Sequence, residues 1–188
     1  VHIRRGENDE AAELFRKTLD RHEFRAAGSL ELAVLYHNRG VVLRNLGDDE
    51  AALGEAEQAA AMNRAAKRFE ELAAHPYLMS SVHLKRKNHS GALRHAEIAL
   101  EYDKKMENSL GIAQDLAAVG TIYEKTGKME EAHDMYTRAF LVYRSLRYLP
   151  GMSLSLEALE AAEEKLDRKE DAKRYREARE LLLSQPPR

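Results

Sequence analysis

The sequence predicts an all-α protein in which about nine helices pack as consecutive antiparallel hairpins. The first observation is composition. Of 188 residues, 44% are hydrophobic and 33% are charged, with only 10 Gly and 4 Pro, and good helix formers such as Ala, Glu, Leu, Arg and Lys dominate. The second observation is a repeat, because one alanine recurs at intervals of 41, 40, 40 and 40 residues. These alanines are Ala11, Ala52, Ala92, Ala132 and Ala172.

A fixed interval of this length is typical of a solenoid, in which each repeat contributes two antiparallel helices. One repeat cannot bury its own apolar face, so the next repeat covers it. Small residues are needed where the helices cross closely, which accounts for the recurring alanine. A turn residue stands five places before each alanine and is expected to separate the two helices of a repeat. The turn residues are Gly6, Gly47, Lys87, Gly127 and Asp167.

The chain begins with a half-repeat, residues 1–28. Residues 7–25 are predicted to form an amphipathic helix with Leu14, Phe15 and Leu19 on one face. By its register this is the second helix of a repeat whose first helix is missing. Its outer face then lacks a neighbour, so we expect either further protein before it or a contact with a second copy of the chain.

Four full repeats follow this half-repeat. Ser29 can cap the first helix of repeat 1, and Pro76 marks a helix start in repeat 2, because proline suits the first turn and not the middle of a helix. Pro150 and Gly151 separate the last two repeats, and the polar surface of the final helix suits the end of a solenoid. The repeats are assigned to residues 29–72, 73–108, 109–149 and 150–184. The predicted helices cover residues 7–25, 30–46, 48–70, 76–87, 89–106, 109–126, 129–147, 152–166 and 168–184.

These residues resemble the tetratricopeptide repeats (TPRs). In that family the first helix carries a large apolar residue, then Leu-Gly, then Tyr, and the second helix carries Ala, an aromatic residue and Ala. Repeats 2 and 4 depart from this pattern, with Ser80 and Glu160 in place of Gly. Repeat 3 matches it well, with Leu116, Val119, Gly120, Tyr123, Gly127, Ala132, Tyr136 and Ala139.

The length of the repeat resembles a particular class of this family. The usual TPR period is 34 residues, whereas a 40-residue period is similar to the extended repeats of Leu-Gly-Asn repeat proteins and kinesin light chains. The resemblance implies a right-handed α-α superhelix that covers the whole chain.

No residue pattern predicts catalysis, a cofactor or a metal site. The chain has no Cys and contains no HExxH, GxSxG, GxxxxGK[ST] or GxGxxG motif. His83, His89 and His95 are six residues apart, which places successive side chains on opposite sides of a helix. The chain is therefore not expected to be an enzyme.

Charge and hydropathy bound the partners. A net charge of -2 does not favour a nucleic-acid binder, and no apolar run reaches the 18 or so residues of a membrane span. A chain without Cys suits the cytoplasm, the periplasm or export equally, so the sequence leaves the compartment open.

The family resemblance places the binding surface on a concave groove formed by the first helix of each repeat. Residues one turn apart on that face mix polar, small and apolar side chains, which suits an extended or helical peptide. The family's terminal-carboxylate clamp is absent, but His37, Arg44 and Lys85 make the N-terminal half of the groove basic and favour an acidic or phosphorylated peptide. The predicted groove residues are His37, Asn38, Val41, Arg44, Tyr77, Leu78, Ser81, Lys85, Gln114, Ala118, Thr121 and Glu124.

The sequence therefore predicts a protein–protein interaction module or scaffold that binds a peptide or protein partner, whose identity it does not specify. Two alternatives remain at this point. One is a self-assembling structural module in which the ends of solenoids stack, and the other is a regulatory or sensor segment of a larger protein.

Overall fold

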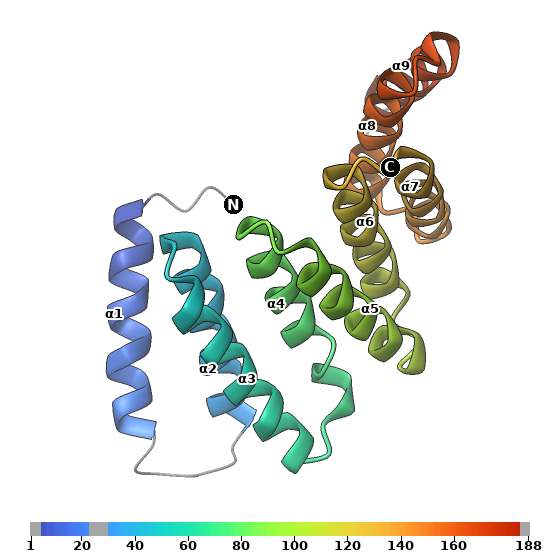
Figure 1. Ribbon diagram of the computed structural model, residues 1–188. Coiled ribbons are helices and arrows are strands. Elements are labelled where there is room, and N and C mark those ends of the chain that lie inside the picture. Colours follow the sequence, from blue (N-terminus) through green and yellow to red (C-terminus); the bar gives the residue numbers. More distant parts are fainter. Residues whose placement is uncertain (1–4, 23–29, 185–188) are drawn as a thin grey trace. The chain divides into compact units, whose positions relative to one another are not determined.

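The structure is a computed structural model that describes residues 5–22 and 30–184, and within these ranges it contains α-helices and one 3-10 turn but no β-strand (Figure 1). This confirms the all-α prediction. The elements are α1 (Arg5–His22), α2 (Leu30–Leu46), α3 (Asp49–Ala65), η1 (Phe69–Glu71), α4 (Ala74–Lys85), α5 (His89–Lys105), α6 (Ser109–Lys125), α7 (Met129–Ser145), α8 (Leu149–Lys165) and α9 (Lys169–Ser184).

The chain divides into two compact units, unit 1 (Val1–Tyr102) and unit 2 (Asp103–Arg188). In unit 1, α1 packs on α2, α2 packs on α3, and α4 packs against both α2 and α3. In unit 2, α6 packs on α7, α7 on α8, and α8 on α9. Each unit is therefore built from neighbouring helix hairpins, as the repeat predicts.

A left-handed residue ends the helices at the turns. Gly47 and Gly127 have φ of 95° and 78°, which glycine adopts without steric cost. The amides of Gly47 and Asp48 both donate to the Leu43 carbonyl, which satisfies the end of α2. Lys87 and Asp167, at the same place in other repeats, have φ of 58° and 57°. The turn positions predicted from the repeat are thus confirmed at all four places that the structure describes.

A second set of turns joins one repeat to the next, and the sequence analysis did not identify it. Lys67, Glu107 and Arg147 have φ of 57°, 54° and 53° and are spaced 40 residues apart. A left-handed conformation costs a non-glycine residue about 1–2 kcal/mol. Packing of the helices on either side must supply that energy.

The recurring alanines lie where second helices cross their neighbours. Ala52, Ala92 and Ala132 have no solvent exposure. In unit 2, Ala132 packs with Tyr136 and Leu159. A Cβ added to Gly120 would lie 2.7 Å from the Tyr136 ring, so this position requires glycine. The small residues of the repeat therefore set how closely the helices approach.

Several predicted helix boundaries were wrong. The helix predicted over 48–70 ends at Ala65, because the left-handed Lys67 breaks it before η1 begins. The helix predicted from residue 152 begins at Leu149 instead, and Pro150 lies in its first turn, where its missing N–H is no loss. Ser29 and residues 23–25 of the first predicted helix lie outside the described residues.

The first helix also corrects a predicted face. Leu19 is buried and Phe15 is half-buried, but Leu14 is 65% exposed and so lies on the opposite side of α1. In the part of the chain that the structure describes, no helix combines the length and the apolar character needed to cross a bilayer.

Candidate peptide-binding faces

Eight of the predicted groove residues lie in unit 1, on α2 and α4. Side-chain contacts join the two helices, because Arg44 Nη1 donates to Ser81 Oγ at 3.0 Å and Lys85 Nζ donates to the Arg44 carbonyl at 2.8 Å. We call the surface formed by these two helices the unit 1 face. The eight residues are His37, Asn38, Val41 and Arg44 on α2, and Tyr77, Leu78, Ser81 and Lys85 on α4.

Arg44 is held in place by neutral groups. Besides its bond to Ser81, its Nε and Nη2 donate to Asn45 Oδ1 at 3.3 and 2.9 Å. Ser81 Oγ in turn donates to the Leu78 carbonyl at 2.7 Å, which fixes the hydroxyl as an acceptor for arginine. Among the described residues, no carboxylate forms an ion pair with this half-buried guanidinium.

Lys85 has a structural role that the sequence did not reveal. Its ammonium donates to the Arg44 carbonyl at the end of α2 and to Asp49 Oδ1 at 3.0 Å. A cation is favourable at a helix C-terminus, where the carbonyls and the helix dipole present negative charge. Because Asp49 already balances its charge, Lys85 joins consecutive repeats and is not a free cation for a ligand.

His37 is the surface end of a chain of polar groups that leads into the core. Its Nδ1 lies 3.3 Å from Nδ1 of buried His75, whose Nε2 lies 2.9 Å from Asn63 Nδ2. Burial lowers the pKa of His75 to about 4, and the charges of His37 and Arg64 add to the effect. Burial and the charge of Arg44 also lower the pKa of His37. Both imidazoles are therefore neutral at pH 7, and one Nδ1 donates to the other.

Leu78 does not belong to the face, which corrects the sequence-based prediction. It is only 2% exposed and packs in a core cluster with Ala56 and Val82. A Cβ on Gly40 would lie 3.0 Å from its Cδ2. The small residues opposite this position leave a space that leucine fills, so the side chain turns inward. In contrast, Asn38 and Tyr77 are exposed and Val41 is half-buried.

The four remaining predicted residues lie on α6 in unit 2, where the polar members are engaged with each other. Tyr136 Oη donates to Glu124 Oε2 at 2.8 Å and lies 3.3 Å from Thr121 Oγ1. Lys165 Nζ donates to Glu124 Oε1 at 2.6 Å. Burial opposes the ionised form of Glu124, but the hydrogen bonds from Lys165 and Tyr136 prevail and lower its pKa. Gln114 is exposed and Ala118 is half-buried.

Buried polar pairs lie at the repeat junctions, and sequence reasoning missed them. Asn63 and His75 are 12 residues apart, and Asp103 and Asp115 stand 40 residues later at the same positions. Asp103 and Asp115 are 5% and 1% exposed. Burial and the Asp103 carboxylate raise the pKa of Asp115 to about 8, so Asp115 holds a proton at pH 7. The signal that would have found these pairs is the polar column of the repeat, which continues with buried Ser155.

Two further histidine contacts occur across helix hairpins. The rings of His83 and His95 stack with centroids 5.2 Å apart, although the six-residue spacing had placed these side chains apart. His133 Nε2 lies 2.9 Å from Glu163 Oε1 and 3.2 Å from Tyr175 Oη. Within residues 5–22 and 30–184, no group of three or more His, Asp or Glu side chains could hold a metal ion.

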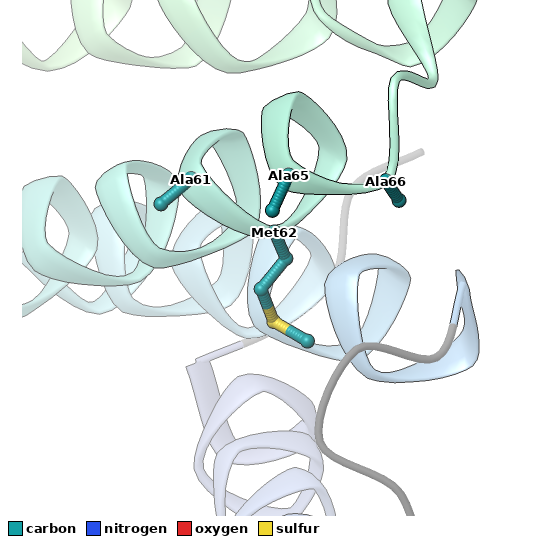
Figure 2. Close-up of a pocket in the computed structure, with 4 residues that line it drawn as sticks. All are labelled: Ala61, Met62, Ala65 and Ala66. Carbon is teal, nitrogen blue, oxygen red and sulfur yellow. The ribbon is translucent and has the colours of Figure 1, made fainter.

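A shallow apolar hollow of about 470 Å³ lies at the C-terminal end of α3 (Figure 2). It is lined by Met62, which extends from the helix, and by three alanines of the same segment. It offers no polar group to orient a ligand, and none of the predicted site residues lines it. The alanines are Ala61, Ala65 and Ala66.

Comparison with known proteins identifies the fold. No protein-family model matches the sequence, and no curated protein matches it. Solved structures do match. BtubC from P. vanneervenii is 17% identical, with a TM-score of 0.82 over 97% of this chain and 77% of BtubC. TPR-like repeats of a kinesin light chain from Podosopora anserina are 16% identical, with a TM-score of 0.75 over 95% of this chain and 88% of that one. The chain has a TPR-like fold.

A third similar structure is longer than this TPR-like chain. Aspartyl phosphate phosphatase F from Bacillus subtilis is 16% identical, with a TM-score of 0.83 over 94% of this chain. The chain spans 47% of the phosphatase. Identities this low establish the TPR-like fold and leave the functional assignment to the chain's own residues.

Proposed function

We propose that this TPR-like chain is a protein-interaction module, and that the first helices of its repeats bind a peptide segment of a protein partner. The observation that carries the proposal is the unit 1 face. There α2 and α4 present exposed Asn38 and Tyr77, half-buried Val41 and an oriented guanidinium, Arg44. Such a mixture of apolar contact and fixed polar groups is what peptide recognition uses.

The two helices of each repeat have different side chains, which also supports the proposal. The second helices contribute buried alanines such as Ala52, Ala56 and Ala59, which hold the repeats together. The first helices carry the polar and apolar side chains that vary between repeats. A repeat protein needs constant residues at its crossings, whereas residues that differ along the array are free to specify a partner.

A known complex offers an analogy. A Rap protein complexed with Competence and Sporulation Factor is 16% identical, with a TM-score of 0.77 over 96% of this chain. We assign no catalytic step to this chain, since the close titratable pairs described above are buried and connect helices.

The proposal is tested by selecting a random peptide display library against the immobilised chain and measuring the enriched peptides by fluorescence anisotropy. Asn38→Trp places a bulky ring on the unit 1 face, and Gln58→Trp is the matched control, because Gln58 is an exposed amide on α3. We expect Asn38→Trp to weaken binding about tenfold or more and Gln58→Trp to leave it unchanged. A selection that enriches no peptide, or equal binding by both variants, would contradict the proposal.

Self-assembly through α1 is a second candidate, favoured by the large exposed side chain of Leu14. Analytical ultracentrifugation of the wild-type chain and of Leu14→Glu over a range of concentrations tests it. A wild-type association that the variant abolishes would support it. A monomer at every concentration would exclude it for this chain.

A further inference from the structure

We propose that Arg44 is the anchor of the unit 1 face for a carboxylate side chain, Glu or Asp, of the bound partner. This inference rests on the proposed function and names the chemistry of the partner. It begins with the charges on and beside the two faces, most of which are already balanced within the chain.

The balanced charges have specific partners. Lys85 pairs with Asp49 at 3.0 Å, and Glu124, which occupies the place of Arg44 two repeats later, pairs with Lys165 at 2.6 Å. Arg39, the other half-buried arginine of α2, lies 3.2 Å from Glu55 Oε1. Arg44 differs from all of these. Its interactions are hydrogen bonds to Ser81 and Asn45, and no described carboxylate lies within ion-pair distance of it.

The guanidinium also has donors to spare. A guanidinium carries five N–H groups, and the contacts to Ser81 and Asn45 use Nε, Nη1 and Nη2 once each. The two remaining N–H groups lie on Nη1 and Nη2 and have no acceptor among the described side chains. Two such donors match the two oxygens of one carboxylate, the geometry in which arginine binds most strongly.

The position of Arg44 is set before a ligand arrives. Asn45 holds one side of the guanidinium, and Ser81, itself bonded to the Leu78 carbonyl, holds another. An arginine that is already ordered loses less side-chain entropy on binding than a free one, so more of the interaction energy contributes to affinity. The same half-buried cation has no counter-charge in the free protein, which favours an anion over a neutral amide.

A single carboxylate fits this charge better than a phosphate. Phosphate recognition by proteins generally uses clusters of arginines, and the nearby Lys85 is already bonded to Asp49. His37 is neutral at pH 7, since burial and the charge of Arg44 lower its pKa. One available positive charge therefore matches one negative charge. Val41, one helical turn before Arg44, adds an apolar contact for the residue next to the acid.

A double-mutant cycle tests the inference, with peptides taken from the display selection. We expect those that bind the unit 1 face to share one acidic position, and changing that Glu to Gln to weaken binding to the wild-type chain about tenfold. Against Arg44→Gln the same peptide change should have almost no effect, because the partner of the carboxylate is gone. Arg94→Gln, an exposed arginine of α5, is the matched control and should behave as wild type.

Two further measurements keep the test independent of folding. Circular dichroism and thermal unfolding verify that Arg44→Gln folds, and Ser81→Ala, which removes a group that orients the guanidinium, should give a smaller loss with the same peptides. Additive effects in the cycle, peptides without a shared acid, or tighter binding of a phosphoserine peptide would overturn the inference. If peptides bind and Asn38→Trp still blocks them, the proposed function stands in those cases. If no peptide binds, the proposed function itself is contradicted, and this inference falls with it.

Discussion

Replacing Asp115 by asparagine should stabilise unit 2 at neutral pH and have little effect near pH 4. Asp115 is buried beside Asp103, and this environment raises its pKa from 3.8 to about 8. In the unfolded chain the group ionises near pH 4, so between pH 4 and 8 the folded state binds more protons than the unfolded state. The stability that comes from this group is complete below pH 4 and is lost as the pH rises toward 8.

The size of the effect follows from the same shift. Each pH unit between the two pKa values changes the free energy of unfolding by about 1.4 kcal/mol. From pH 4 to pH 7 the upper limit is about 4 kcal/mol, and relaxation around a buried charge reduces it, so we expect about 2 kcal/mol. Asparagine keeps the shape of the protonated acid and can donate from Nδ2 to Asp103, but it does not ionise.

Urea unfolding at pH 4, 5, 6 and 7, followed by circular dichroism, measures the difference between Asp115→Asn and the wild-type chain. The gain from the substitution should grow steadily with pH. Asp134→Asn, at an exposed aspartate of α7, is the control and should show no such trend. A constant difference at every pH, or a variant less stable than wild type at pH 7, would refute the assignment of a protonated Asp115.

Three further changes test the packing and the buried polar groups. Gly120→Ala places a Cβ 2.7 Å from the Tyr136 ring and should cost about 1–3 kcal/mol of unfolding free energy, measured by urea titration. Gly54→Ala, in a helical position with no atom within 4 Å, should instead stabilise the chain by up to about 1 kcal/mol. Leu78→Ala should cost about 2–5 kcal/mol, and a smaller loss typical of a surface site would return Leu78 to the binding face. Lowering the pH from 7 to 5 should favour unfolding by about 2 kcal/mol through His75, whose folded pKa is about 4 against 6.5 unfolded. His75→Gln should remove this contribution in the same titration.

The sequence predicted the architecture well because the repeat constrains it at many places at once. The alanine spacing located the helix crossings, and Gly47 and Gly127 located turns that the structure confirms. The boundaries next to Lys67 and Pro150 were less predictable. A lysine carries no sign of a left-handed backbone, and a proline suits both a loop and the first helical turn.

The candidate site was predicted less completely. A helical register gives the direction of a side chain but not the space opposite it, and for this reason Leu78 was assigned to the face and not to the core. Polar residues such as Asp103 and Asp115 resemble solvated residues when each is considered alone. Their burial depends on a partner 12 residues away, and only a comparison of the same column in every repeat reveals it.

The lysines at the ends of α4 and α8 affect how the array unfolds. Lys85 reaches the end of the preceding first helix, and Lys165 reaches Glu124 in the same way, each across 41 residues of sequence. Such links add a nearest-neighbour coupling, so that opening one repeat also removes a contact from the repeat before it. Because both lysines are about half exposed, each coupling is worth less than about 1 kcal/mol and weakens with salt. Cooperativity between repeats should therefore come mainly from the alanine crossings, with ionic strength as a fine adjustment.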